Sequence, residues 1–90
     1  MTEAVRRIAA DNPAAARRLR DAFSASSHLI GTRPLAGRRQ PALVGDSYRI
    51  WSVQGFPYIL VYRPASRPPR IIRVLHTARD LPPLLADLQD

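Results

Sequence analysis

Apolar and polar residues alternate most clearly in the second half of the chain, and this pattern predicts three consecutive β-strands between residues 47 and 80. The three segments are rich in β-branched and aromatic residues, and they are Ser47–Val53, Tyr58–Arg63 and Arg70–Leu75. Gln54 and Gly55 suit a turn between the first two. The proline-rich run 64–69 cannot continue a ladder, because proline has no N–H to donate. Short loops between consecutive strands predict an antiparallel meander.

The second of these strands is expected at the centre of the sheet, because its apolar side chains fall on both faces. One face carries Tyr58, Leu60 and Tyr62, and the other carries Ile59, Val61 and Arg63. In the third strand, simple alternation puts Ile71 and Leu75 on one face, opposite Ile72 and Val74.

The first thirty residues predict a helical hairpin. Val5 and Ile8 suit a short amphipathic helix over residues 2–10. The sequence Asp11-Asn12-Pro13 is expected to end this helix and cap the next. From Ala14 the apolar positions recur with helical spacing, and they are Ala15, Leu19, Ala22, Phe23, Ser26 and Leu29. This second helix is expected to fray near Ser26-Ser27-His28 and to stop at Gly31.

A single domain follows from these elements, with a helical hairpin (1–30), a loop (31–46), an antiparallel sheet (47–80) and a C-terminal helix (81–90). Arg38-Arg39 is expected at the exposed tip of the loop. Asp80 is expected to cap the last helix, whose apolar residues Leu81, Leu85 and Leu88 lie along one side and pack back on the domain. The predicted fold is α+β: a helical hairpin packed on a three-stranded antiparallel sheet with a short C-terminal helix.

Charge indicates the kind of partner. The chain of 90 residues carries 14 basic residues, all arginine, against seven acidic ones, for a net charge of +7. Such a surface attracts polyanions, either nucleic acid or an acidic protein segment. The absence of cysteine excludes disulfides and thiolate zinc sites. No apolar run approaches the roughly 18–20 residues of a membrane span, and the charged N-terminus does not resemble a secretory signal, so we expect a cytoplasmic protein.

A candidate cationic site lies at the end of the third strand, where Arg73, His76 and Arg79 follow one another. Arginine makes bidentate bonds with phosphates and carboxylates, so this group suits contacts with a partner. A structural alternative stays open, in which Arg73 is solvated, His76 hydrogen-bonds the strand end and Arg79 pairs with an acidic group. Further candidates for contacts with a partner are Arg63, Arg67 and Arg38-Arg39, because these residues are expected to be exposed.

Other kinds of site find less support in the sequence. The aromatic residues could form a base-stacking platform, but a domain this small needs them in its core, with Trp51 as the main exception. No metal site is expected, because His28 and His76 are far apart and lack cysteine or a spaced carboxylate. No glycine-rich phosphate loop or nucleophile elbow is present, and no cofactor is expected.

A resemblance to a known family rests on three stretches. PYILVYR, a turn and IIRVLHTARDLP resemble the C-terminal half of the ParE/RelE superfamily of small toxins from bacterial type II toxin–antitoxin systems. The helix DNPAAARRLRDAF and the connection RPLAGRR extend the similarity over most of the chain. The ending His76-x-x-Arg79-Asp80 is the most distinctive part and points to the ParE branch, and Arg49 and Arg79 fall near basic positions of the family.

The resemblance implies a function. ParE-like toxins bind and poison DNA gyrase without known chemistry of their own and are neutralised by a cognate antitoxin, so no catalytic residue is expected. RelE-like toxins instead cleave messenger RNA on the ribosome with basic side chains, one of them an arginine in the central strand, and in several members a tyrosine near the C-terminus. Here that strand position aligns with Ile59, and no tyrosine follows Tyr62. Cleavage stays an alternative, as do a basic nucleic-acid-binding module and an inactive toxin relic.

One departure from the family concerns the start of the chain. Family members usually begin with a β-strand and a long first helix, whereas this chain starts about halfway along that helix. Either the true start lies upstream or the strand is absent, and absence would leave a sheet edge open. A strand from the antitoxin or from a second copy would cover it, so we expect a complex or an oligomer.

Overall fold

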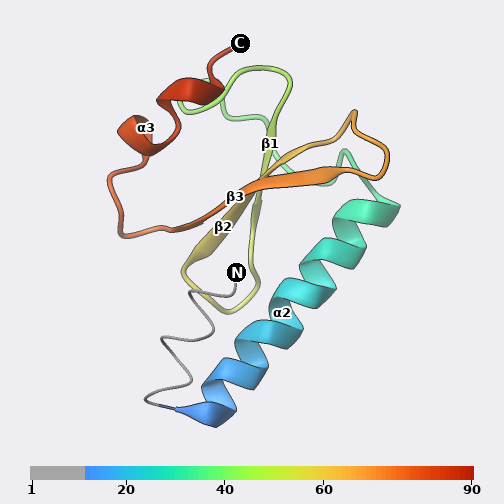
Figure 1. The fold of residues 1–90 in the computed structure, drawn as a ribbon, viewed down its shortest axis with the longest axis vertical. Coiled ribbons are helices and arrows are strands. Elements are labelled where there is room, and N and C mark those ends of the chain that lie inside the picture. Colours follow the sequence, from blue (N-terminus) through green and yellow to red (C-terminus); the bar gives the residue numbers. More distant parts are fainter. Residues whose placement is uncertain (1–11) are drawn as a thin grey trace.

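The computed structural model describes residues 12–90, and it places a long helix across a small sheet (Figure 1). The elements are helix α2 (Pro13–Thr32), strands β1 (Arg49–Ser52), β2 (Tyr58–Arg63) and β3 (Arg70–His76), helix α3 (Leu81–Leu84) and the 3-10 helix η1 (Ala86–Leu88). The helix expected over residues 2–10 lies outside the described residues. The predicted α+β class is confirmed, with a helix on the antiparallel sheet and a short C-terminal helix.

Helix α2 begins at the predicted break. The side-chain oxygen of Asn12 accepts a hydrogen bond from the Ala15 N–H at 3.1 Å. Pro13 stands in the first turn, where no backbone donor is needed. The buried residues of the helix recur every three or four positions, and they are Ala16, Leu19, Phe23, Ser26 and Ile30.

The helix does not fray near Ser26, which corrects one expectation. Ser26 is buried, and its Oγ accepts a hydrogen bond from Trp51 Nε1 at 3.2 Å. The serine hydroxyl is therefore satisfied across the interface between helix and sheet. The helix also continues through Gly31 and ends at Thr32, where Arg33 N donates to Leu29 O at 2.7 Å.

The sheet has the strand order β1-β2-β3, so the prediction of a central second strand is confirmed. Both pairings are antiparallel. Gly55 in the turn between β1 and β2 has a φ of +82°, a conformation that glycine adopts without strain. The observed strands differ from the predicted ones by at most two residues at an end, within the usual uncertainty of strand boundaries.

A β-bulge in β3 overturns the expected alternation of its side chains. Val61 pairs with Arg73 but the next residue, Tyr62, pairs with Ile71, so Ile72 is an extra residue. As a result Ile72 and Leu75 pack on one face of the sheet, and Ile71 and Val74 pack on the other. The expectation that Ile71 shares a face with Leu75 was therefore wrong, because a bulge shifts the alternation by one residue.

The two faces of the sheet carry separate cores. We call the face under α2 the helix face; its buried residues are Leu19, Phe23, Ile30, Val53, Leu60 and Tyr62. We call the other face the C-terminal face; its buried residues are Val44, Tyr48, Ile50, Ile59, Val61, Leu85 and Leu88. The predicted division of the apolar side chains of β2 is therefore confirmed.

The segment between α2 and β1 lies along the sheet instead of projecting from it. Arg38 N donates to Ile50 O, and Ile50 N donates to Arg38 O, both at 2.9 Å. The Tyr62 hydroxyl donates to Pro34 O at 2.6 Å and accepts from Gly37 N at 2.8 Å. Glycine is required at 37, because a Cβ there would lie 2.5 Å from this hydroxyl. Arg38 and Arg39 are exposed as expected, but the backbone of Arg38 pairs with the sheet, so the expectation that they form the tip of the loop was wrong.

The C-terminal helical segment packs back on the C-terminal face, as predicted. Leu85 and Leu88 are buried there, and Gly45 N donates to Leu88 O at 2.8 Å. The side chain of Asp80 makes no capping hydrogen bond to α3, contrary to expectation. Within residues 12–90, no helix has the length and apolar character needed to cross a membrane.

Candidate functional site

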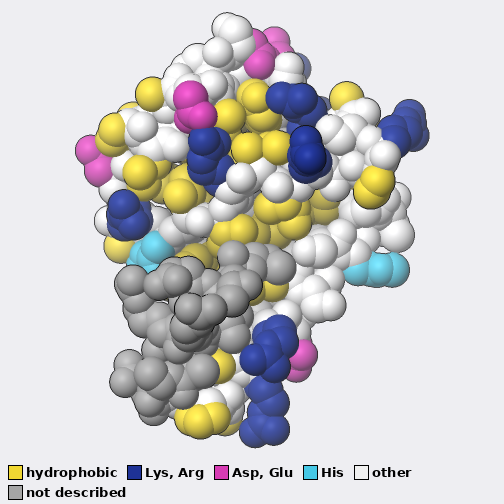
Figure 2. Space-filling model, viewed as in Figure 1, with side chains coloured by type: hydrophobic (Ala, Val, Ile, Leu, Met, Phe, Trp, Pro, Cys, Tyr) yellow, Lys and Arg dark blue, Asp and Glu magenta, His cyan; other side chains and the backbone are white. Residues whose placement is uncertain are grey.

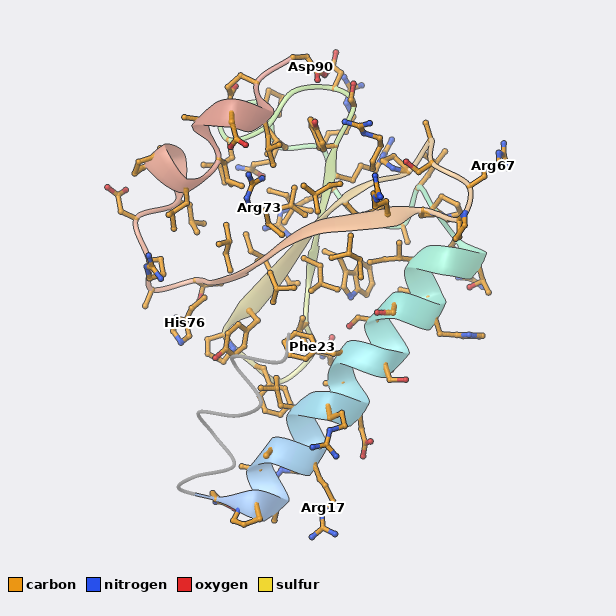
Figure 3. All side chains as sticks on the ribbon, in the orientation of Figure 1. Arg17, Phe23, Arg67, Arg73, His76 and Asp90 are labelled. Carbon is orange, nitrogen blue, oxygen red and sulfur yellow. The ribbon has the colours of Figure 1, made fainter. Side chains whose placement is uncertain are left out.

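The three residues Arg73, His76 and Arg79 do not form one cluster. Arg73 pairs with Val61, whose side chain lies on the C-terminal face, and His76 pairs with Tyr58 on the helix face. Figure 3 shows Arg73 near the middle of β3, on the side of the sheet toward the C-terminus, and His76 where the strand ends. The separation of three residues already puts these two side chains on opposite faces of a strand, which is visible in the sequence alone.

Each of these residues has its own surroundings. Arg73 Nη2 forms an ion pair with Asp87 Oδ2 at 2.6 Å. The His76 ring packs edge-on against Tyr58 at 5.1 Å between ring centroids, and its Nδ1 accepts from Ala78 N at 3.0 Å. Arg79 is exposed in the turn after β3, where its N–H donates to His76 O at 3.0 Å.

Arg49 holds the chain before β1 in place. Its Nη1 donates to Gly37 O at 2.9 Å and to Leu35 O at 3.3 Å. Its side chain lies on the helix face, because it pairs with Tyr62. The guanidinium is therefore engaged with backbone carbonyls of its own chain.

A different set of arginines comes together at the loop between β2 and β3. Arg63 and Arg70 are directly opposite each other in the register, and Arg67 is exposed in the loop between them. We call these three residues the hairpin arginines. Arg63 Nη2 donates to Tyr48 Oη at 2.9 Å, and its guanidinium lies 5.3 Å from the centre of the Tyr48 ring. In Figure 3, Arg67 points away from the sheet into solvent.

Arg63 and Arg70 face each other across two strands, and like charges in this arrangement repel. Binding of an anionic partner would reduce this repulsion. Two ion pairs occur among residues 12–90, Arg39–Asp46 and Arg73–Asp87, and neither involves a hairpin arginine. Arg70 was not among the partner-binding residues predicted from the sequence. The signal was present, because the residues that flank an antiparallel hairpin loop face each other, and Arg63 and Arg70 flank the run 64–69.

The geometry limits the chemistry available at this surface. His76 lies at the opposite end of the hairpin, because it pairs with Tyr58 while Arg70 pairs with Arg63. Five residues of strand separate the two ends, which is about 17 Å. His76 is therefore too far away to move a proton on a phosphate held by the hairpin arginines. Residues 12–90 contain no group of three or more histidine and acidic side chains that could hold a metal ion.

The aromatic side chains serve mainly as core. Tyr48 and Tyr62 are buried, and Phe23 packs edge-on against Tyr58 at 5.8 Å between ring centroids. Trp51 is half-buried with its indole N–H bonded to Ser26. These residues do not present a flat aromatic face to solvent.

Figure 2 shows arginine side chains spread over the face on which β3 lies, with acidic side chains near the C-terminus. The fold and this surface together define a small basic α+β protein with a cationic β-hairpin. A family model described as the ParE toxin of the type II toxin–antitoxin system, parDE, matches residues 1–81. The chain belongs to this family of toxins. Membership implies an antitoxin partner. No curated protein and no solved structure matched the chain.

Proposed function

We propose that this protein is a ParE-like toxin that inhibits DNA gyrase in the cytoplasm and is neutralised by its cognate antitoxin. The observation that carries the proposal is the match to the ParE family, which extends over residues 1–81 of the 90. The net charge of +7 supports an acidic antitoxin segment as partner, because attraction between opposite charges speeds the encounter.

Burial at two positions supports gyrase inhibition over RNA cleavage. Ile59, at the central-strand position where the resemblance implies a basic residue in RNA-cleaving relatives, is buried in the C-terminal face. Tyr62, the last tyrosine of the chain, has no exposed surface, and its hydroxyl is bonded to Pro34 and Gly37. Neither side chain can reach an RNA phosphate.

The hairpin arginines and Arg79 are the contacts that we propose for the partner or the target. Arg67, Arg70 and Arg79 are exposed and lack an ion pair among residues 12–90. Arg49 and Arg73 are instead engaged within the chain, and we propose for them a supporting role.

Two assays on the purified protein test the proposed function. The protein should stop gyrase from supercoiling relaxed plasmid, and it should leave messenger RNA intact in a translation reaction with ribosomes. Addition of the antitoxin should restore supercoiling. Cleaved messenger RNA together with normal supercoiling would contradict the proposal and establish the RelE-like alternative.

A matched pair of charge reversals tests the contact surface. Arg67→Glu should raise the concentration needed for half-inhibition about tenfold, as loss of a close charge contact does. Arg17→Glu changes the net charge equally at an exposed position of α2 and should change this concentration less than about twofold. Equal effects would exclude the hairpin as the contact surface and leave gyrase inhibition itself standing.

A further inference from the structure

A hollow lies where the end of α2 approaches the loop between β2 and β3, and Figure 1 shows these two parts of the chain near each other. It is lined on one side by Gly31, Pro34 and Leu35, and on the other by Pro64 and residues 66–69. Four of the lining residues are proline, so the lining is largely apolar and its backbone is restricted. The volume of about 500 Å³ leaves room for apolar side chains of a partner.

Leu35 extends into solvent from a segment whose backbone is held in place. Its side chain is 68 % exposed, and it is the only exposed large apolar side chain among residues 12–90. The Tyr62 hydroxyl binds Pro34 O and Gly37 N, on either side of Leu35, and Arg49 Nη1 donates to Leu35 O at 3.3 Å. A leucine on a backbone fixed in this way loses little conformational freedom when a partner covers it, so Leu35 suits a preorganised apolar contact.

The surroundings of the hollow are positively charged. The two segments that line it, residues 31–35 and 63–70, contain four arginines and no acidic residue. All four are exposed, and none takes part in an ion pair among residues 12–90; they are Arg33, Arg63, Arg67 and Arg70. An apolar hollow beside these charges is complementary to a protein surface on which acidic side chains surround an apolar one.

We propose that this hollow is the contact surface for the target protein, and that it receives an apolar side chain whose acidic neighbours pair with Arg67 and Arg70. The inference rests on the proposed function, in which the target is DNA gyrase. A segment that adds a strand to the sheet would pair with β3, which begins at Arg70, whereas the hollow lies beyond β3, in the loop 64–69. DNA suits the hollow less well, because its phosphates would use the arginines and leave Leu35 uncovered.

Substitution of Leu35 tests the apolar part of this contact in the supercoiling assay with purified gyrase. Leu35→Ala should raise the concentration needed for half-inhibition about fivefold, and Leu35→Glu should raise it more than about tenfold, because it also places a negative charge against an acidic surface. Ala25→Glu adds the same charge at an exposed position of α2 and should change this concentration less than about twofold. Equal effects of the two glutamates would overturn this inference but not the proposed function, whereas an unaltered chain that leaves supercoiling intact would overturn both.

The same variants distinguish the target from other occupants of the hollow. Binding of Leu35→Glu to the cognate antitoxin should stay within about threefold of that of the unaltered chain, while its binding to immobilised gyrase should weaken more than about tenfold. A larger loss for the antitoxin than for gyrase would assign the hollow to the antitoxin and overturn the proposal. Inhibition that is weakened by Arg67→Glu but unchanged by Leu35→Ala would indicate contacts with DNA phosphates and would also overturn it.

Discussion

The two faces of the sheet are closed by very different structures. On the helix face, the single 20-residue helix α2 contributes Leu19, Phe23 and Ile30 to one continuous core. On the C-terminal face, two helical pieces of four and three residues lie over the sheet and contribute Leu85 and Leu88. One face thus depends on a regular element, and the other depends on segments too short to be stable in isolation.

Contacts distant in sequence hold the C-terminal segment in place. Asp90 Oδ2 accepts a hydrogen bond from Ser47 N at 2.7 Å, and the Gln89 side chain donates to Leu43 O. Asp87 pairs with Arg73. The C-terminal segment depends on these few contacts, whereas α2 also has the backbone hydrogen bonds of a 20-residue helix, so we expect the C-terminal face to open locally at a lower free energy than the helix face.

The largest expected effect comes from the helix face. Phe23→Ala should lower the free energy of unfolding by about 3–5 kcal/mol, because it removes a ring that is 1 % exposed and contacts Tyr58. Small domains have only about 5–15 kcal/mol in total, so this variant should lose a large share of its stability. Urea denaturation followed by circular dichroism measures the change. Arg17→Ala, on the exposed side of α2, is the control and should change stability by less than about 0.5 kcal/mol.

The corresponding change on the C-terminal face should cost less. Leu85→Ala should lower the free energy of unfolding by about 2–3 kcal/mol, at the low end for buried leucines, because the short segment can shift to fill the space. Hydrogen exchange should quicken over residues 81–90 and stay slow in α2. Equal quickening in both regions would contradict the view that the two faces open separately.

The next largest loss of stability is expected from removal of a hydrogen-bonded hydroxyl on the helix face, that of Tyr62. Tyr62→Phe removes the hydroxyl that bonds both Pro34 O and Gly37 N, and it leaves these backbone groups without that partner. We expect a loss of about 1–3 kcal/mol in the free energy of unfolding. Tyr58→Phe is the matched control on the same face, since Tyr58 is half-buried, and should cost less than about 0.5 kcal/mol. Equal losses would show that the Tyr62 hydroxyl does not hold the segment before β1.

These differences also explain how much could be predicted from the sequence. The strands, the central place of β2 and the stripe of α2 depend on local periodicity, which is visible in the order of residues. The bulge at Ile72 could not be predicted, because it depends on how β3 packs on both faces at once. The bridge from Arg38 to Ile50 was missed for a similar reason, since it joins residues twelve apart across a segment without periodicity.

In the candidate site too, local features could be predicted from the sequence, whereas contacts between distant segments could not. The facing of Arg63 and Arg70 could be inferred from the hairpin alone, and the opposite faces of Arg73 and His76 from their spacing. Two other contacts could not be inferred from the sequence, the ion pair of Arg73 with Asp87 and the hydrogen bond of Arg49 with Gly37. Each of them joins segments that only the tertiary structure brings together.

The smallest expected effect concerns the two ion pairs, which have the same N–O distance of 2.6 Å but different surroundings. In the pair Arg39–Asp46 both side chains are more than half exposed, at 57 % and 77 %, whereas the Arg73 side chain is 32 % exposed.

Asp46→Asn should therefore change the free energy of unfolding by less than about 0.5 kcal/mol, and Asp87→Asn should lower it by up to about 1 kcal/mol. Among residues 12–90, removal of Asp87 also leaves Arg73, whose Nη1 has no hydrogen-bond partner there, without an ion pair. Urea denaturation at low and high salt distinguishes the two pairs, since salt should screen the exposed pair more strongly. Equal effects of both substitutions would mean that burial of Arg73 adds nothing to its pairing. The C-terminal segment would then be held by the packing of Leu85 and Leu88 and by the hydrogen bonds of Asp90 and Gln89.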